Sequence, residues 1–171
     1  MIHKYQLVLF DVDSTLIEQE VIDLLANETQ HGQQVADVTS RAMAGELNFD
    51  EALRQRVALL RGLPETVFAK VLDQITFSPG ALSLIRELQN RKIFVGAVSG
   101  GFLNVLTTLF SDLRFDFLHA NTLEVSNGVL TGEVIGSIVN REMKKQKLIN
   151  SQSNSLSTSK TPLRLEMAQT I

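Results

Sequence analysis

Two aspartates separated by one residue, Asp11 and Asp13, follow an apolar run at residues 7–10 and precede Ser14 and Thr15. Carboxylates at this spacing can face one cavity, where one acts as a nucleophile and the other as a general acid and then a general base. Their hard oxygen atoms also suit Mg²⁺, which usually completes its shell with water and substrate phosphate. Asp and Ser are equally common in polar loops and helix caps, so the motif by itself leaves both interpretations open.

A second polar cluster, Ser99-Gly100-Gly101, ends the mostly apolar run at residues 92–98 and precedes a helical pattern. A hydroxyl group and free backbone N–H groups at the start of a helix can cradle a phosphate. A plain turn is the alternative, because Ser and Gly are also typical of turns.

Charged residues at three further places could serve the same chemistry. Glu20 lies one or two helical turns after Asp13, and Arg56 lies beside the apolar Val57 rather than in a run of charges. Surface salt bridges are the alternative role for both. A basic cluster could supply one lysine to a phosphate, although a solvated helix face is the usual meaning of such a cluster. Its members are Arg141, Lys144, Lys145 and Lys147.

The elements that must position these residues follow from hydrophobic patterning. Residues 7–10 and 92–98 are predicted strands, each ending in polar residues, and ligands of open α/β sheets bind beyond such strand ends. Helical patterns fill the region between them, with Asn48 or Asp50 as the expected cap of one helix and Ser78-Pro79 as the start of another. Asn127-Gly128 between β-type residues predicts a hairpin. The order of elements predicts an α/β core with a helical insertion near residues 16–75.

Composition excludes several classes of protein. The 171 residues are 44% hydrophobic and 20% charged, which is enough for a buried core. The net charge of −3 and pI near 5.6 argue against nucleic-acid binding, and the lack of cysteine excludes disulfides and thiolate metal sites. We find neither a signal-peptide core nor a run long enough to span a membrane, so a cytoplasmic protein without membrane contact is expected. The Ser-rich residues 150–160 are expected to form a flexible loop.

Taken together, these motifs resemble the haloacid dehalogenase superfamily of phosphotransferases. Residues 10–17 are similar to its first motif and residues 98–102 to its second. Within the superfamily, the phosphoserine phosphatases are the group that this chain resembles, over roughly residues 5–148. The segments that carry this narrower resemblance are residues 42–49, 53–57, 120–123 and 128–132. The resemblance implies a doubly wound, Rossmann-like parallel sheet in a core of residues 1–15 and 76–171, with a small helical cap at residues 16–75.

The resemblance also implies a Mg²⁺-dependent reaction on O-phosphoserine, the last step of serine biosynthesis, through an aspartyl-phosphate on Asp11. Asp13 would protonate the leaving serine and then activate water, and the Asp11 carboxylate and Asp13 carbonyl would contact Mg²⁺. Ser99, Gly100 and a lysine would hold the phosphate. Lys144 is the expected lysine, with Lys145 as its rival. The remaining roles concern the rest of the substrate: Glu20 would face its amino group, Arg56 its carboxylate, and Met43 and Phe49 would close the cap over it.

The family's fourth motif, Gly-Asp-x-x-x-Asp/Asn, has no counterpart here, because Asp116 is the last aspartate. We therefore expect a chain truncated before that motif, without its C-terminal strands and with one carboxylate fewer for Mg²⁺. The strand at residues 7–10 is then expected to become an exposed edge. Two alternatives stay open: a phosphatase or phosphotransferase for another small phosphomonoester, and an inactive scaffold that acts as a binding or interaction domain. The sequence predicts no oligomeric state.

Overall fold

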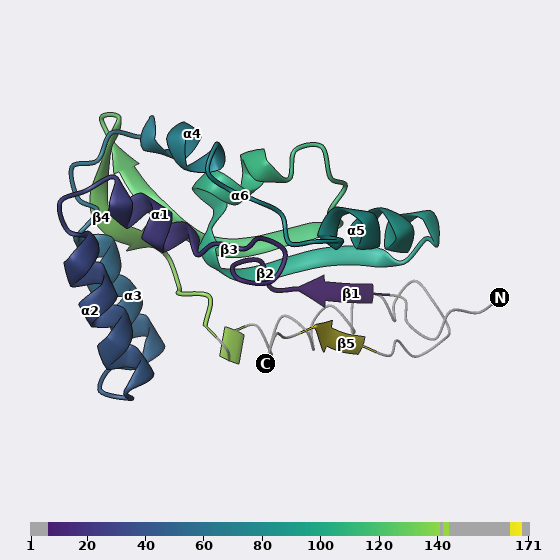
Figure 1. The fold of residues 1–171 in the computed structure, drawn as a ribbon, viewed down its shortest axis with the longest axis horizontal. Coiled ribbons are helices and arrows are strands. Elements are labelled where there is room, and N and C mark those ends of the chain that lie inside the picture. The colour runs from purple at the N-terminus through teal and green to yellow at the C-terminus, as the bar shows by residue number, and fades with distance from the viewer. Residues whose placement is uncertain (1–6, 141, 144–164, 169–171) are drawn as a thin grey trace.

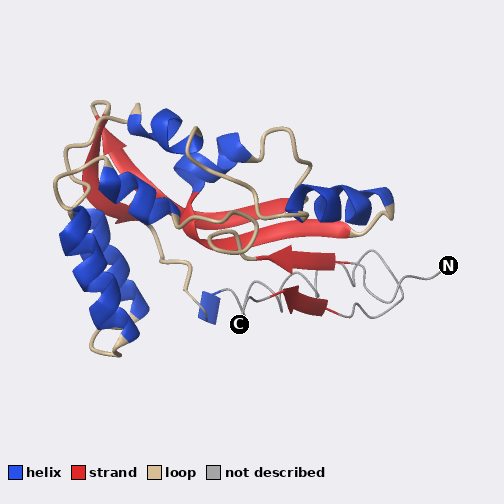
Figure 2. Cartoon of the chain, in the orientation of Figure 1, coloured by secondary structure: helices blue, strands red, loops and turns tan. Residues whose placement is uncertain are grey.

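The computed structural model describes residues 7–140, 142–143 and 165–168. Its strands form one sheet and are β1 (Leu7–Phe10), β2 (Phe94–Phe102), β3 (Phe117–Ser126), β4 (Val129–Ile135) and β5 (Leu165–Ala168). Their order is β4-β3-β2-β1-β5 (Figure 1). All neighbours pair in parallel except β3 and β4, which are antiparallel. Together with the helices between the strands, this confirms the predicted α/β class (Figure 2).

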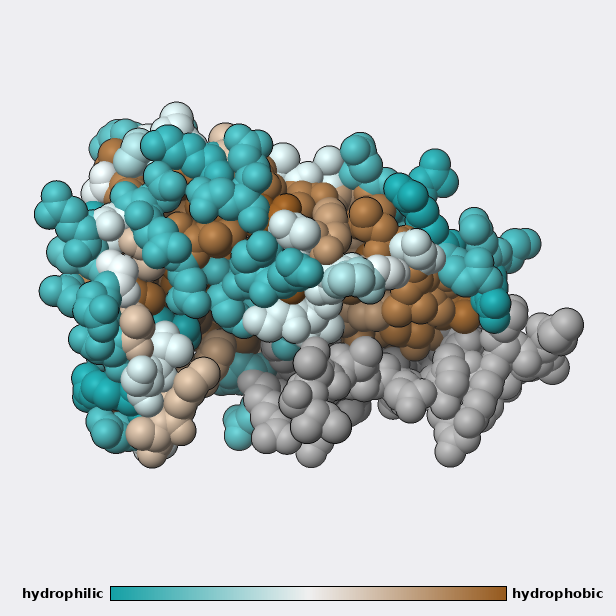
Figure 3. Space-filling model, viewed as in Figure 1, coloured by the Kyte–Doolittle hydropathy of each residue, from teal (hydrophilic) through white to brown (hydrophobic). Residues whose placement is uncertain are grey.

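The helices fall into two groups (Figure 1). The first four belong to the insertion at residues 16–75 and are α1 (Val21–Asn27), α2 (Gly32–Met43), α3 (Phe49–Ala58) and α4 (Val67–Leu72). The other two, α5 (Ala81–Asn90) and α6 (Leu103–Leu109), lie along one side of the sheet. Hydrophilic residues cover most of the helices in the view of Figure 3, and apolar ones show between them. Within the described part of the chain, no helix is both long and apolar enough to cross a membrane.

The first strand buries both of its faces. Phe10 belongs to the main hydrophobic core, whereas Leu7 and Leu9 pack with Val98 and Val139 in a second, smaller cluster. Successive side chains of a strand point to opposite faces, so the two clusters pack against opposite faces of the sheet at β1. A continuous apolar run is what a parallel strand covered on both sides requires, and it confirms the buried strand predicted at residues 7–10.

The expectation that this strand forms an exposed edge is wrong. β5 pairs with β1 in parallel, from Leu7 opposite Leu165 to Phe10 opposite Ala168, so β1 lies between β2 and β5. Unpaired N–H and C=O groups at the edge of a sheet favour the addition of another strand. The short segment Leu165–Ala168 takes that place, and the edge of the sheet moves outward by one strand.

The predicted hairpin is confirmed at β3 and β4. Asn127 and Gly128 both have positive φ, 52° and 77°, which is the backbone that a two-residue turn of this kind needs. The hairpin also supports the insertion, because the N–H of Leu130 donates to the carbonyl of Leu63 at 2.8 Å and the N–H of Gly62 donates to the carbonyl of Leu130 at 2.9 Å.

The two ends of the helical insertion run side by side. Ile17 and Phe77 form an antiparallel bridge, and the N–H of Ser78 donates to the carbonyl of Leu16 at 2.9 Å. Between these ends, α2 and α3 project from the body of the molecule (Figure 1). The helix expected from Ser78-Pro79 begins slightly later, since α5 starts at Ala81 and the carbonyl of Ser78 accepts from the Ala81 N–H at 3.0 Å.

Candidate active site

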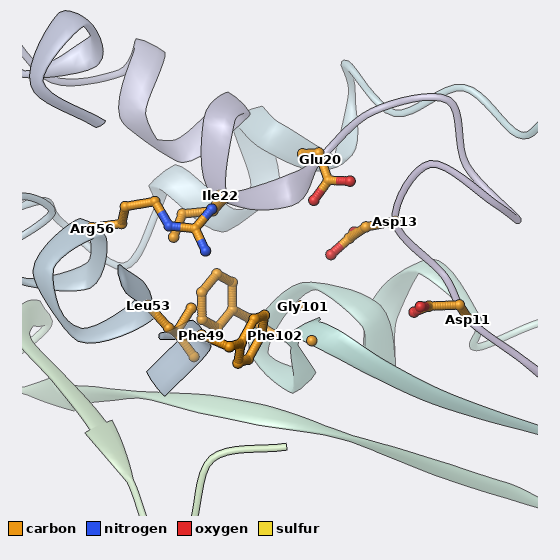
Figure 4. Close-up of a pocket in the computed structure, with 10 residues that line it drawn as sticks. Asp11, Asp13, Glu20, Ile22, Phe49, Leu53, Arg56, Gly101 and Phe102 are labelled. Carbon is orange, nitrogen blue, oxygen red and sulfur yellow. The ribbon is translucent and has the colours of Figure 1, made fainter. Parts of the chain in front are cut away.

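A pocket opens where the carboxyl ends of β1 and β2 meet the insertion (Figure 4). Residues that follow β1 line it together with residues of β2, α1 and α3. The lining residues are Asp11, Asp13, Glu20, Ile22, Phe49, Leu53, Arg56, Gly100, Gly101 and Phe102. The structure thus brings together six of the nine residues predicted for the site: Asp11, Asp13, Glu20, Phe49, Arg56 and Gly100.

The two aspartates are held by a tight turn around Val12. The Val12 side chain is fully buried, and its carbonyl accepts from the N–H groups of Thr15, Leu16 and Ile17 at 3.1, 2.9 and 3.1 Å. The Val12 N–H donates to Asp11 Oδ1 at 2.9 Å. Because the residue between them is anchored in the core, Asp11 and Asp13 can both face the pocket, as Figure 4 shows.

Gly101 lets Asp13 approach the end of β2 closely. A Cβ atom on Gly101 would lie 2.6 Å from Asp13 Oδ2 and 3.2 Å from Ser99 Oγ, so any other residue would displace these groups. The Gly101 N–H donates to Ser99 Oγ at 2.9 Å. Ser99 is fully buried and does not line the pocket, and its hydroxyl supports the end of β2 through this hydrogen bond.

Ser14 orients Glu20. The Ser14 hydroxyl donates to Glu20 Oε1 at 2.7 Å, and Ser14 itself has a φ of 53°, an unusual backbone for a residue with a side chain. The sequence showed Ser14 only as part of the aspartate motif. Its φ and its contact with Glu20 emerge once the chain turns back between residues 14 and 19, where the Ser14 N–H donates to the Gln19 carbonyl at 3.2 Å.

Arg56 brings a positive charge to the side of the pocket opposite Asp11 and Asp13 (Figure 4). Burial lowers the pKa of its guanidinium below the ordinary value, and nearby carboxylates, with Asp23 the strongest, oppose that shift. An arginine keeps its proton in proteins, so the group stays a cation. Its Nε donates to the Ala52 carbonyl at 3.3 Å, which anchors the side chain along α3.

Phe49 covers the end of β2. A Cβ atom on Gly100 would lie 3.1 Å from Phe49 Cζ, so the ring rests on the Gly100 backbone. Met43, which was predicted to help close the same cap, is 85% exposed at the end of α2 and does not line the pocket. Lys144, its rival Lys145 and the expected loop at residues 150–160 lie outside the described residues.

The donor set is suited to a hard cation. Asp11 and Asp13 offer carboxylate oxygen atoms, and Mg²⁺ is commonly held by one or two carboxylates together with water and substrate phosphate. Among the residues that the structure describes, no group of three or more His, Asp or Glu side chains could hold a metal ion. The Asp11 carboxylate and an oxygen atom of Asp13 are the groups that would hold Mg²⁺ here.

Four lining residues were not predicted: Ile22, Leu53, Gly101 and Phe102. Gly101 and Phe102 belong to the motif at residues 98–102. Ile22 on α1 and Leu53 on α3 lie close in sequence to the predicted residues Glu20 and Arg56. Leu53 precedes Arg56 by three residues, a spacing that places both on one face of α3. Helical spacing from Arg56 could therefore have identified Leu53 from the sequence.

The comparisons with known proteins agree with this geometry. Residues 8–152 match the family model of haloacid dehalogenase-like hydrolases. A phosphoserine phosphatase of Streptococcus thermophilus is 49% identical over 142 residues, which cover 83% of this chain and 66% of that protein. The phosphoserine phosphatase SerB2 of Mycobacterium tuberculosis is 46% identical over 143 residues, which cover 84% of this chain and 35% of that protein. This chain thus spans about two thirds of the first relative and about one third of the second.

A solved structure of a substrate-bound phosphoserine phosphatase has the same fold. It aligns with a TM-score of 0.82 at 38% identity, and the alignment covers 90% of this chain and 73% of that one. From the family match over most of its length and from this shared fold, we conclude that the chain belongs to the haloacid dehalogenase-like hydrolase family.

Proposed function

We propose that this chain carries the site of a Mg²⁺-dependent phosphoserine phosphatase, which releases serine and phosphate from O-phosphoserine. The observation that carries the proposal is the division of one pocket into two ends. Asp11 and Asp13 lie at one end and Arg56 at the other, with Glu20 beside Asp13 between them. The phosphoserine phosphatases that resemble the chain support the same assignment.

The charges of the pocket complement those of phosphoserine. An arginine can hold a carboxylate through two parallel hydrogen bonds, so Arg56 would bind the carboxylate of the substrate. Glu20, which the Ser14 hydroxyl orients, would bind its ammonium group. The phosphate would then lie against the backbone of Gly100, with Lys144 as its further partner, and Ser99 would act through its hydrogen bond with the Gly101 N–H.

In the first step, a carboxylate oxygen of Asp11 attacks the phosphorus atom. A new O–P bond forms as the bond to the serine oxygen breaks, and Asp13 gives its proton to that oxygen. Serine leaves, and the phosphoryl group stays on Asp11 as an aspartyl-phosphate. Asp13, now a carboxylate, lies next to the Gly101 backbone with its Oδ2 on the side of β2.

In the second step, Asp13 accepts a proton from water as the water oxygen attacks phosphorus. The bond between phosphorus and Asp11 breaks, so phosphate leaves and both aspartates regain their starting forms. Asp11 and the carbonyl of Asp13 would hold Mg²⁺, which would neutralise charge on the transferring phosphoryl group. This chain's own residues supply the nucleophile, the proton transfer and the orientation of the substrate.

Residues 16–75 would act as a cap over the core of residues 1–15 and 76–171. The antiparallel pairing of Ile17 with Phe77 supports this division, because it brings the two ends of the insertion together beside the core. Phe49, which rests on Gly100, would exclude water from the first step, and Met43 would join it on closure. We place the enzyme in the cytoplasm, at the last step of serine biosynthesis.

Steady-state hydrolysis by the full chain with Mg²⁺ tests the proposal. We expect kcat/KM for O-phosphoserine to exceed that for phosphoethanolamine, which lacks the carboxylate, and the difference to collapse in Arg56→Ala. Equal values for both substrates in the wild type would favour another phosphomonoester. Equal background rates for the wild type and Asp11→Asn would leave an inactive binding scaffold.

A further inference from the structure

Asn121 on β3 is one of two buried polar side chains among the described residues, and Ser99 is the other. Its side chain is 2% exposed and makes hydrogen bonds with two segments that are distant in sequence. Asn121 Nδ2 donates to the Gly100 carbonyl at 2.7 Å, and Asn121 Oδ1 accepts from the Val139 N–H at 2.8 Å. A buried amide that uses both ends in this way fixes the distance between its two partners.

The Gly100 carbonyl belongs to the same planar peptide unit as the Gly101 N–H. That N–H donates to Ser99 Oγ, so Asn121 and Ser99 hold the peptide unit from opposite ends. The unit lies directly beside Asp13 Oδ2, because a Cβ atom on Gly101 would be only 2.6 Å from that oxygen. Rotation of this peptide would therefore change both the phosphate-binding backbone and the space that Asp13 occupies.

The second partner of Asn121 leads to the insertion. Val139 is buried in the smaller hydrophobic cluster, and the next residue, Asn140, donates through Nδ2 to Asp50 Oδ1 at 3.1 Å. Asp50 follows Phe49 on α3, and the Phe49 ring rests on Gly100. The contacts form a closed ring from Gly100 through Asn121, residues 139–140 and α3 back to Gly100.

We propose that Asn121 is a positioning residue that sets the Gly100–Gly101 peptide for phosphate binding and registers it against the insertion. This inference rests on the proposed function, because the phosphate site is the one assigned there. Asn121 does not line the pocket itself, so the residue acts through Gly100 and Val139. The opposing explanation is a purely structural role, in which the amide only satisfies buried backbone groups.

Asn104 on α6 offers a matched control. It also makes two hydrogen bonds to the backbone of β3, from Nδ2 to the Leu123 carbonyl at 3.2 Å and from the Leu123 N–H to Oδ1 at 2.8 Å. Neither partner belongs to the pocket. Replacing Asn104 removes a comparable pair of hydrogen bonds and leaves the Gly100–Gly101 peptide in place.

The test compares Asn121→Asp with Asn104→Asp in the full chain. Asp at residue 121 keeps an acceptor for the Val139 N–H but loses the donor to Gly100, whereas Asn121→Ala loses both. We measure the Kd for inorganic phosphate with Mg²⁺ by calorimetry, the Tm, and kcat and KM for O-phosphoserine. We expect both Asn121 variants to raise the phosphate Kd about tenfold or more, the factor that corresponds to one hydrogen bond of about 1.4 kcal/mol.

The Asn104 variant is expected to lower Tm similarly while its phosphate Kd stays within about twofold of the wild type. Equal phosphate Kd values for the folded Asn121 and Asn104 variants would overturn the proposal, as would a wild type that binds no phosphate. If Asn121→Ala fails to fold, Asn121→Asp decides by the same criterion. A wild type that binds phosphate without hydrolysing phosphoserine removes the proposed function, and the phosphate Kd then still decides the role of Asn121.

Discussion

Asn140 Nδ2 donates a hydrogen bond to Asp50 Oδ1 at 3.1 Å across 90 positions of sequence. Asn140 lies just beyond the smaller hydrophobic cluster of the sheet, and Asp50 lies in the first turn of α3. The same Asn140 side chain accepts through Oδ1 from the Met143 N–H at 3.0 Å, so its amide is held in one orientation. The bond therefore joins the core to the helix that carries Phe49 and Arg56.

Removal of this bond is predicted to loosen the insertion. Asp50→Ala should raise KM for O-phosphoserine severalfold, because α3 would cover the pocket for less of the time. Asp50→Asn keeps an oxygen acceptor for Asn140 and should retain most of the wild-type KM. Asp37→Ala, which removes an exposed carboxylate of α2 bonded to Gln33, serves as the control in the same kinetic measurement. Identical KM values for the three variants would contradict the prediction.

A side chain at residue 101 is predicted to abolish activity. In Gly101→Ala the new Cβ would lie 2.6 Å from Asp13 Oδ2 and 3.3 Å from Asp13 Cγ, so the carboxyl group would have to leave its position. We expect kcat to fall about 100-fold or more, equivalent to about 2.7 kcal/mol of lost transition-state stabilisation. Gly32→Ala is the control, because its Cβ would meet neighbours only at 3.7 Å and beyond. A Gly101→Ala enzyme with normal kcat would show that Asp13 does not depend on this close approach.

The Ser14 hydroxyl is predicted to act on substrate recognition rather than on the chemical step. Ser14→Ala removes the hydrogen bond to Glu20, and KM for O-phosphoserine should rise severalfold with little change in kcat. 3-Phosphonooxypropanoate, which is phosphoserine without its ammonium group, should show no such rise. Ser14→Gly should affect KM alike but give a higher Tm than Ser14→Ala, because glycine adopts a φ of 53° without strain. A Tm order reversed between the two variants would contradict the backbone argument.

Replacement of Arg56 by lysine is predicted to introduce a pH dependence. Burial lowers the pKa of the cation at this position, and the ordinary pKa of lysine, about 10.4, lies well below that of arginine. Deprotonation of the folded Arg56→Lys variant therefore begins at lower pH, and KM for O-phosphoserine should rise between about pH 8 and 10. Because the ammonium group of the substrate titrates in the same range, each KM is divided by the wild-type KM at that pH, and this ratio should stay constant for the exposed Arg54→Lys control but rise for Arg56→Lys. A flat profile for Arg56→Lys would mean that the position does not bind the substrate through charge.

The N-cap of α3 is predicted to stabilise the insertion. Asn48 accepts from the Glu51 N–H at 2.9 Å, and Glu51 accepts from the Asn48 N–H at 3.1 Å, a complete capping box. Asn48→Ala should lower the free energy of unfolding by about 1 kcal/mol. Denaturant unfolding measures this loss, with Gln55→Ala on the exposed face of the same helix as the control. Equal stability of the two variants would argue against the cap.

Local patterns predicted much of this protein because local forces determine those parts. The hairpin at Asn127-Gly128 depends on two φ angles, and the strand at residues 7–10 on a continuous apolar run. For the cap of α3, the sequence left Asn48 and Asp50 as candidates. The structure has Asn48 as the cap, where it forms a capping box with Glu51. The aspartate and Ser-Gly-Gly motifs came together because parallel strands end at the same edge of the sheet.

Features that depend on distant contacts could not be predicted in the same way. Asn121 appeared within a family-like segment, but its hydrogen bonds to Gly100 and Val139 exist only after three strands and a loop have assembled. The position of Met43 at the exposed end of α2 likewise depends on how the whole insertion lies over the core. The pairing of β5 with β1 joins segments from opposite ends of the sequence, which no periodicity in either segment reveals.

That last pairing has a consequence for how the chain folds. Leu7 pairs with Phe94 on one side and with Leu165 on the other, so the strand synthesised first receives its second neighbour last. Closing so long a loop costs conformational entropy before the contacts compensate for it, and folding rates fall as contacts become more distant in sequence. A growing chain on the ribosome would hold β1 with one side unpaired until residues 165–168 emerge. The sheet is therefore expected to be completed only after residues 165–168 have emerged, and chaperones that shield apolar strands would act during that interval.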